Sequence, residues 1–134
     1  MKVYLASKFK LKERVKKIAK ELEKSGHEIT VKWWTRDYKK LKLNDYDWYR
    51  DDRIFKVCSR NYRGVVDADV VVLVCHESRS QKFTGANIEI GIAMGLKKEV
   101  YSIGKLERSA MYSMVRQTTN ISELLNGLRH YQTN

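Results

Sequence analysis

An uninterrupted run of apolar residues, most of them β-branched, at Val70–Cys75 limits the fold of this 134-residue chain more than any other feature. Such a run is typical of a strand that is buried on both faces, because a strand with one face in water alternates apolar and polar residues. Strands of this kind belong to parallel sheets that helices cover. The run therefore predicts an α/β fold.

Segments with strand character alternate with segments of helical length along the whole chain. This alternation predicts a parallel sheet with right-handed crossovers. We expect one domain over residues 1–134, a three-layer α/β sandwich whose five-stranded parallel sheet has the flavodoxin-like order 2-1-3-4-5. The expected strands are Lys2–Ala6, Glu28–Trp34, Val70–Cys75, Glu99–Ile103 and Met114–Thr118, and the expected helices are Leu11–Lys24, Asp47–Arg63, Gly85–Leu96, a short turn at Ser109–Tyr112 and a last helix capped by Asn120 and Glu123.

Two of these helices carry apolar residues whose burial the pattern predicts. The helix at Gly85–Leu96 is apolar nearly all round and is therefore expected to be buried on every side. The segment Thr35–Asp47 has no periodicity and is expected to be a long loop. The helix that follows this loop is expected to turn inward the residues Trp48, Phe55, Cys58 and Tyr62.

One ionisable residue, Glu89, interrupts the apolar helix. At helical spacing it shares a face with Ala86, Ile92 and Ala93, residues that ordinarily line a core. Burial of an unpaired carboxylate costs roughly several kcal/mol, so Glu89 is expected to be partnered, protonated or open to a ligand cleft. The alternative is a glutamate that stabilises the helix start, but Glu89 lies beyond the first turn, where the helix dipole acts most strongly.

The carboxyl ends of the strands are the expected place for a site. In open parallel sheets, ligands bind beyond these ends, where the connections reverse direction. The start of the Glu89 helix opens onto the same edge. The other residues at this edge are Ala6 and Ser7, Cys75 and His76, and Ile103 and Gly104.

The charge of the chain predicts attraction to anions. Its 27 lysines and arginines outnumber 16 aspartates and glutamates, for a net charge of +11. Nucleic acid, anionic lipid and phosphorylated metabolites all fit this charge, and so does a solvated helix face.

The two cysteines, Cys58 and Cys75, form no CxxC or Cys/His cluster and fall in apolar contexts, so neither a metal site nor a disulfide is expected. No cofactor is expected either. The N-terminal apolar run is too short for a signal peptide, and no stretch reaches membrane-spanning length. We therefore expect a cytoplasmic protein without a membrane partner.

Three segments together resemble a known family. They are MKVYLASKF at the start, VDADVVVLV before the loop and TGANIEIGIAMGLKKEVYSIG after it. In this order, with a closing helix, they resemble the nucleoside 2-deoxyribosyltransferase superfamily, including the related deoxynucleoside 5′-monophosphate N-glycosidases. The resemblance covers most of the chain and leaves only Thr35 to about Ile54 without a counterpart.

The resemblance implies cleavage or transfer of an N-glycosidic bond. The nucleophile of the family falls on Glu89, and the tyrosine that positions it falls on Tyr4, which is alternatively a packing aromatic. The carboxylate attacks the anomeric carbon, the base departs, and water or a second base resolves the glycosyl-enzyme. Glu89 must then be ionised, a state that a hydrogen bond from Tyr4 and the nearby helix start both favour.

At the position where the family usually has a catalytic acid, this chain has Asn61. Asparagine forms hydrogen bonds but carries no catalytic proton. Either Asp67, Asp69 or solvent protonates the base, or turnover is weakened or lost.

A second departure is Phe83, where the transferases have an aspartate and the monophosphate glycosidases a serine. A shift of the loop could place Ser80 or Thr84 there instead. A 5′-phosphate could be held by Lys8, Arg79, Lys82 and the amides of Ser7 and Gly85, a base could stack on Phe9 or Trp34, and His76 could contact the ligand. Surface charge, core packing and a structural histidine are the alternative explanations.

Family subunits complete each other's pockets with the segment after the fourth strand. By position this segment is 108–114, so the resemblance implies a homodimer or larger assembly in which Ser109, Met111 and Tyr112 reach across. Alternatively, the segment covers its own core.

Two other functions stay open. The first is a non-catalytic nucleotide-binding or sensing domain on the same scaffold, which Asn61 and Phe83 favour. The second is a basic nucleic-acid-binding module, although the chain lacks an RRM, KH or helix-turn-helix signature.

Overall fold

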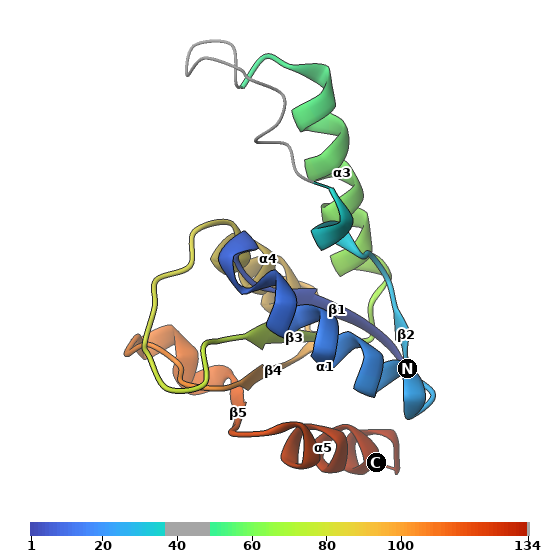
Figure 1. The fold of residues 1–134 in the computed structure, drawn as a ribbon, viewed down its shortest axis with the longest axis vertical. Helices are drawn as coiled ribbons and strands as arrows, with labels where there is room; N and C mark the ends of the chain where they lie inside the picture. The colour runs from blue at the N-terminus through green and yellow to red at the C-terminus, as the bar shows by residue number, and fades with distance from the viewer. Residues whose placement is uncertain (37–48, 134) are drawn as a thin grey trace.

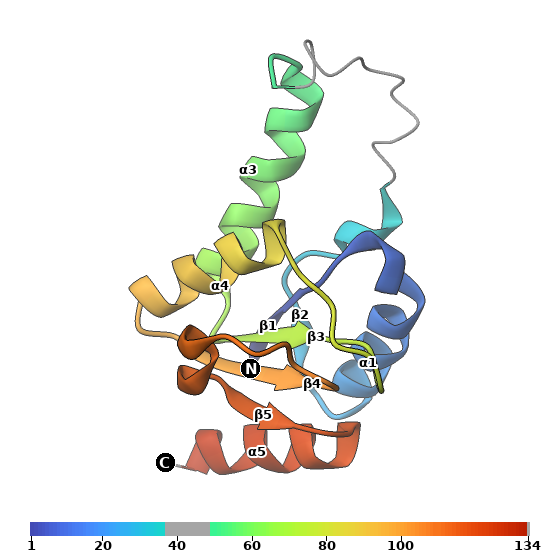
Figure 2. The same ribbon diagram turned by 90° about the vertical axis from the view of Figure 1, so that its left-hand side faces the viewer.

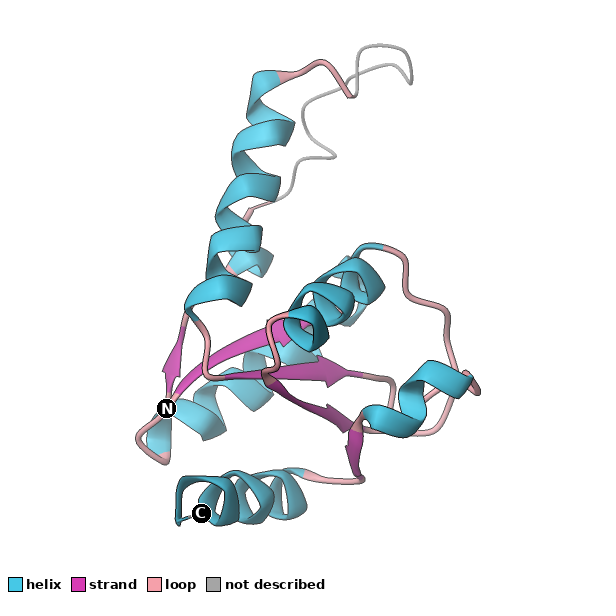
Figure 3. Ribbon diagram, turned by 180° about the vertical axis from the view of Figure 1, so that it is seen from behind, coloured by secondary structure: helices cyan, strands magenta, loops and turns pink. Residues whose placement is uncertain are grey.

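The computed structural model describes residues 1–36 and 49–133, and its centre is one parallel sheet. Five strands lie in the order β2-β1-β3-β4-β5, so the predicted fold class and strand order are confirmed. Figure 3 shows the parallel strands enclosed between helices. The strands are β1 (Lys2–Ala6), β2 (Glu28–Ile29), β3 (Val70–Val74), β4 (Glu99–Ile103) and β5 (Arg116–Thr118).

Helices cover both faces of the sheet, which makes three layers (Figure 2). The helices α1 (Lys12–Lys24) and α5 (Ile121–Thr133) pack on one face, and α3 (Asp52–Asp67) and α4 (Gly85–Gly95) pack on the other. Alternate strand residues supply two cores: Val3 and Leu5 contact the α1 side, whereas Tyr4 and Ala6 contact the α3 and α4 side. Within 1–36 and 49–133, three 3₁₀ segments follow strands or connect elements: η1 (Phe9–Leu11), η2 (Trp33–Thr35) and η4 (Ala110–Met114).

The strand β3 is fully buried, as its composition predicts. All five of its residues have an exposed fraction of 0%, and it pairs with β1 on one side and β4 on the other. Each buried valine or leucine contributes about 1.5–3 kcal/mol relative to an exposed one. This strand therefore holds the two halves of the sheet together and fixes where its carboxyl end lies.

The second strand is shorter than the prediction Glu28–Trp34. Regular pairing covers only Glu28–Ile29, and the chain then bends into η2. The indole Nε1 of Trp33 donates to the carbonyl oxygen of Leu5 at 2.6 Å, and the rings of Trp33 and Trp34 meet edge to face. The aromatic pair is thus held by packing rather than by strand alternation.

The helix α3 begins later and packs differently from the prediction. Its N-cap is Asp51, whose side chain accepts a hydrogen bond from the Arg53 amide at 2.8 Å; the predicted start at Asp47 and residue Trp48 lie outside the described residues. The predicted inward face is wrong, because Phe55, Cys58 and Tyr62 are exposed. The N-terminal half of α3 projects beyond the sheet (Figure 1), so only the turns around Gly64 and Val65 are buried.

The helix α4 is buried on one side only. Ala86, Ile90 and Ala93 face the core, whereas Ile88 and Leu96 are 65% and 50% exposed. The prediction of burial all round is therefore wrong: α3 and the sheet cover one side of α4 and leave an apolar strip on the other.

The last helix begins as predicted. Asn120 Oδ1 accepts from the Glu123 amide at 2.9 Å, and Glu123 Oε2 accepts from the Thr119 amide at 2.8 Å. Leu124 and Leu128 are fully buried. Within 1–36 and 49–133, no helix is long and apolar enough to cross a membrane.

Candidate active site

A phenol and a carboxyl group meet at the switch point of the sheet, between β1 and β3. Tyr4 in the middle of β1 is fully buried and faces α3 and α4. Its hydroxyl donates a hydrogen bond to Glu89 Oε2 in the second turn of α4. The hydrogen bond expected between these two residues is therefore present. It joins a strand of the sheet to a helix that begins at the carboxyl edge.

Burial controls the protonation of this pair. Glu89 is half-buried beside Ala86 and Ala93, and this desolvation raises its pKa to about 7, while the hydrogen bond from Tyr4 lowers it by less. Burial and the nearby Glu89 raise the pKa of Tyr4 far above its ordinary value, so Tyr4 stays a neutral donor. The carboxyl group of Glu89 is therefore about half ionised near pH 7. The resemblance, by contrast, implied an ionised nucleophile.

Two polar side chains of α3 have buried atoms without a hydrogen-bond partner. Asn61 Oδ1 and Arg60 Nε are both buried without a hydrogen-bond partner. A buried polar atom without a partner costs about 1–3 kcal/mol, which a ligand that bonds to it would recover. Asn61 is a candidate from the sequence, whereas nothing in the sequence singles out Arg60, because an arginine on a charged helix usually lies in solvent.

The start of α4 is held by a network that the sequence analysis missed. The hydroxyl of Tyr112 donates to Asn87 Oδ1, and Asn87 Nδ2 donates to the carbonyl oxygen of Phe83 at 2.5 Å. Thr84 is the N-cap, but its side chain makes no capping hydrogen bond. Asn87 instead joins the residue before the N-cap to Tyr112 of η4. Tyr112 is buried in its own chain, while Ser109 and Met111 are exposed.

The residues expected to hold a phosphate bond mostly to the protein itself. Ser7 Oγ donates to the carbonyl oxygen of Val74 at 2.7 Å, and Lys8 Nζ donates to that of Lys82 at 2.9 Å. These bonds tie the loop after β1 to the loop after β3. Ser80 and Gly85 are exposed, and a Cβ at Gly85 would meet nothing within 4 Å.

The aromatic candidates separate into different environments. Trp34 is 7% exposed and packs in the core on the α1 face, the opposite side of the sheet from Glu89. Phe83 is 5% exposed and packs in the core under Lys8, whose Nζ lies 5.4 Å from the ring centroid. Phe9 is half-buried with Lys12 Nζ 4.5 Å from its ring. Of these three, only Phe9 keeps part of its surface at the edge of the sheet.

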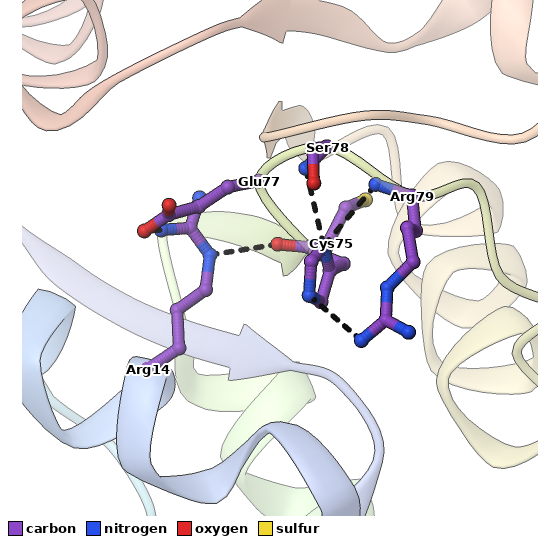
Figure 4. Close-up of polar contacts among 6 residues, drawn as sticks. Arg14, Cys75, Glu77, Ser78 and Arg79 are labelled. Atoms are coloured by element: carbon purple, nitrogen blue, oxygen red, sulfur yellow. Dashed lines mark hydrogen bonds and ion pairs between the residues drawn. The ribbon is translucent and has the colours of Figure 1, made fainter.

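A second polar cluster lies after β3, where Figure 4 labels Arg14, Cys75, Glu77, Ser78 and Arg79. The amides of Ser78 and Arg79 both donate to His76 Nδ1 at 3.1 Å, so the ring shapes the turn. Arg14 of α1 donates to the carbonyl oxygen of Cys75 at 2.7 Å and pairs with Glu77 at 3.0 Å.

Two cavities flank this edge. One of about 480 Å³ is lined by Arg14, His76, Arg79 and Gln81 among others, and one of about 530 Å³ by 106–110 with Tyr112. Neither is lined by Glu89. Within the described part of the chain, no group of three or more His, Cys, Asp or Glu residues could hold a metal ion.

The fold is one that nucleoside-processing enzymes of known structure share. A 2-deoxyribosyltransferase from Bacillus psychrosaccharolyticus aligns over 94% of this chain and 91% of its own, with a TM-score of 0.65 and 18% identity. The CMP N-glycosidase BcmB from Clostridium botulinum aligns over 98% of this chain and all of its own, with a TM-score of 0.55 and 19% identity. No protein-family model and no curated protein sequence matches the chain. At these identities the likeness establishes the fold.

Proposed function

We propose that this protein cleaves or transfers the N-glycosidic bond of 2′-deoxynucleosides or their 5′-monophosphates, with Glu89 as the nucleophile. The observation that carries the proposal is the hydrogen bond from Tyr4 to a half-buried Glu89 at the carboxyl edge of the sheet. The fold supports it, because the two solved structures described above are named as a deoxyribosyltransferase and a CMP N-glycosidase.

The chemistry proceeds through two displacements. Tyr4 holds Oε2 of Glu89 and thereby orients Oε1 toward the sugar. The carboxylate forms a bond to the anomeric carbon, the bond from that carbon to the base breaks, and the base leaves with the electron pair. Water or a second base then attacks the same carbon and releases Glu89.

Where the resembled family has a proton donor, this chain has Asn61, whose amide group forms hydrogen bonds. Its buried, unpartnered Oδ1 can accept a hydrogen bond from an amino group of the base or a hydroxyl group of the sugar. The departing base then takes its proton from solvent, which favours bases that leave readily. We expect turnover to be slower than with a carboxylic acid at this position.

The decisive experiment is release of free base from a panel of 2′-deoxynucleosides and 5′-monophosphates, followed by chromatography. Turnover that disappears in Glu89→Gln supports the proposal, and base exchange with an added base identifies a transferase. Glu28→Gln is the matched control, because Glu28 is an exposed glutamate at the start of β2. A panel that yields no free base, or release that survives Glu89→Gln, contradicts the proposal.

A non-catalytic nucleotide-binding domain is the second candidate function. Asn61 favours this function, because the chain has an amide at the position where the resembled family has a catalytic acid. It predicts thermal stabilisation by nucleotides without release of base. Binding that persists in Glu89→Gln with no turnover in the parent protein would support this function instead.

We further propose a homodimer in which the exposed strip of α4 faces a second copy of the chain. A strip of this kind is costly to leave in water. Ser109, the N-cap of η4, and Met111 within η4 are exposed and can reach a partner's site, whereas Tyr112 bonds within its own chain. The large exposed apolar side chains on α3, on α4 with its C-cap and on η4 are Phe55, Tyr62, Val66, Ile88, Leu96, Met111 and Met114.

A further inference from the structure

The exposed aromatic side chains gather on and beside α3. Within 1–36 and 49–133 they are Tyr49, Phe55 and Tyr62, with exposed fractions of 89%, 71% and 53%. Tyr49 lies just before α3, and the other two lie on it. The N-terminal half of α3, with Phe55, projects beyond the sheet (Figure 1). Several exposed rings on one element mark an interaction surface rather than scattered surface residues.

A cation directly follows each of these rings in the sequence. The three pairs are Tyr49–Arg50, Phe55–Lys56 and Tyr62–Arg63. The two pairs on α3 are seven residues apart, which is about two helical turns, so their rings share one face of the helix. Lys56 and Arg63 are exposed and form a second row beside the rings. We call these four residues the aromatic-basic face of α3.

The charge on this part of α3 is positive. Between Asp52 and Asp67 the charged residues are all cations, namely Arg53, Lys56, Arg60 and Arg63. Arg53 is neutralised, because its side chain bonds to Asp51 at 3.0 and 2.8 Å. Lys56 and Arg63 form no ion pair with a carboxylate of residues 1–36 or 49–133. The aromatic-basic face therefore complements an anionic partner that also has flat apolar groups.

We propose that the aromatic-basic face of α3 binds single-stranded nucleic acid, with bases stacked on Phe55 and Tyr62 and phosphates beside Lys56 and Arg63. Aromatic rings next to positive charge hold single strands in this way without sequence preference. The two rings are about 10 Å apart along the helix, the span of about three nucleotides. The net charge of +11 adds long-range attraction. This binding does not depend on Glu89 and goes beyond the proposed function.

Two other occupants of this face fit the residues less well. A helix that lies on an acidic membrane needs a broad apolar face, whereas the half-buried Ser59 lies between Phe55 and Tyr62 at helical spacing. A second copy that places the same face against this one would bring Lys56 and Arg63 close to like charges, which is unfavourable.

The test is fluorescence anisotropy with a labelled oligothymidylate of about 20 nucleotides and with a duplex of the same length. The parent protein is expected to prefer the single strand. Its affinity should fall from about 50 to about 200 mM salt with a log–log slope of about −1.4 or steeper, as two phosphate contacts predict. Phe55→Ala and Tyr62→Ala should each weaken binding about 5-fold or more through lost stacking. Lys56→Ala and Arg63→Ala should each make the slope shallower by about 0.7.

Two matched controls remove the same kinds of group elsewhere. Met114→Ala removes a side chain of η4 that is 64% exposed, and Lys20→Ala removes an exposed cation of α1 on the other side of the sheet. Both should bind the oligonucleotide within about 2-fold of the parent protein, and circular dichroism checks that every variant is folded. Glu89→Gln should also bind it like the parent protein, so failure of the glycosidic reaction leaves this inference standing.

Four results overturn the proposal. The first is no binding of the oligonucleotide at the lowest salt, and the second is equal affinity for single strand and duplex. The third is unchanged affinity in Phe55→Ala and Tyr62→Ala. The fourth is an effect of Phe55→Ala on another partner in place of the oligonucleotide: lost binding to vesicles of phosphatidylserine and phosphatidylcholine would assign the face to a membrane, and lost self-association by light scattering would assign it to a second copy.

Discussion

The hydroxyl of Tyr4 donates to the carboxyl group of Glu89, 85 residues further along the chain. This hydrogen bond forms only when β1 and α4 pack together, so it reports on the assembled fold. It also joins the least exposed tyrosine of the sheet to the one acidic residue of α4. Burial and hydrogen bonding act on Glu89 in opposite directions, and burial dominates. The pair can therefore be tested through its titration.

The rate of base release is expected to rise with pH until Glu89 is ionised. Only the carboxylate is a nucleophile, and the pKa of Glu89 is raised to about 7. Below this pKa, kcat/KM should fall about tenfold per pH unit, and above it the profile should level off. Steady-state assays from pH 5 to 9 measure this fall in kcat/KM. Glu28→Gln should leave the pH profile unchanged. A profile that is flat from pH 5 to 8 contradicts Glu89 as the nucleophile.

The same shift predicts a change in stability with pH. The folded-state pKa lies above the ordinary value of 4.5, so the contribution of Glu89 to stability is full below about 4.5 and is lost as pH rises through about 7. Glu89→Gln should therefore be more stable than the parent protein at pH 8, by up to about 3 kcal/mol, and nearly equal to it at pH 4.5. Urea unfolding at both pH values measures the difference, and no gain at pH 8 would show that Glu89 is not desolvated.

Replacing Tyr4 by phenylalanine should shift the titration of Glu89 upward. The hydrogen bond from Tyr4 lowers the pKa of Glu89, so its loss raises that pKa and moves the acidic limb of the rate profile to higher pH. The variant should also lose about 0.5–1.5 kcal/mol of stability. Tyr101→Phe is a matched control, because Tyr101 is buried on the other face and donates to the Gly127 carbonyl oxygen at 3.2 Å. If the acidic limb of the pH–rate profile moves equally in Tyr4→Phe and Tyr101→Phe, the shift comes from lost stability alone.

The strand order was predicted from the alternation of strands and helices, and Glu89 was singled out by its apolar helix, whereas Tyr4 was named as its partner only through the family resemblance. The apolar run of β3 marks the sheet centre, and a lone carboxyl group in an apolar helix marks a site. Periodicity failed for α3: it identifies an apolar face, but Phe55 and Tyr62 are exposed because nothing described in the chain covers that part of the helix.

The missed residues are those whose surroundings come from distant segments. Arg14 bonds to Cys75 only because the loop after β3 passes over α1, and Asn87 bonds to Tyr112 only because η4 lies against α4. Neither contact has a signal in the local sequence. Arg60 is similar, because its burial depends on how α3 crosses β1.

Restoring a serine at position 83 should destabilise the protein rather than create a phosphate ligand. Phe83 is 5% exposed and packs with the core residues of α4. Phe83→Ser should cost about 3–5 kcal/mol, as large-to-small changes at buried phenylalanines do. Chemical denaturation measures the loss. Thr84→Ser is the control, because Thr84 is exposed and its side chain caps nothing. A stable Phe83→Ser variant with improved use of monophosphates would instead show that this side chain reaches the ligand.

A charge on the exposed strip of α4 should separate the proposed dimer. Ile88 is 65% exposed on a helix whose opposite side is core, so a lysine there costs little in the monomer but is unfavourable when a second copy covers it. We expect the parent protein to have the mass of a dimer by light scattering, and Ile88→Lys to have the mass of a monomer with an unchanged circular dichroism spectrum. Ser122→Lys adds the same charge at an exposed position of α5 on the other face and should stay dimeric.

If Ser109 and Met111 of the partner complete the site, the monomeric variant also loses base release, and dilution of the parent protein lowers its specific activity. A parent protein that is monomeric at all concentrations yet fully active would show that each chain carries a complete site.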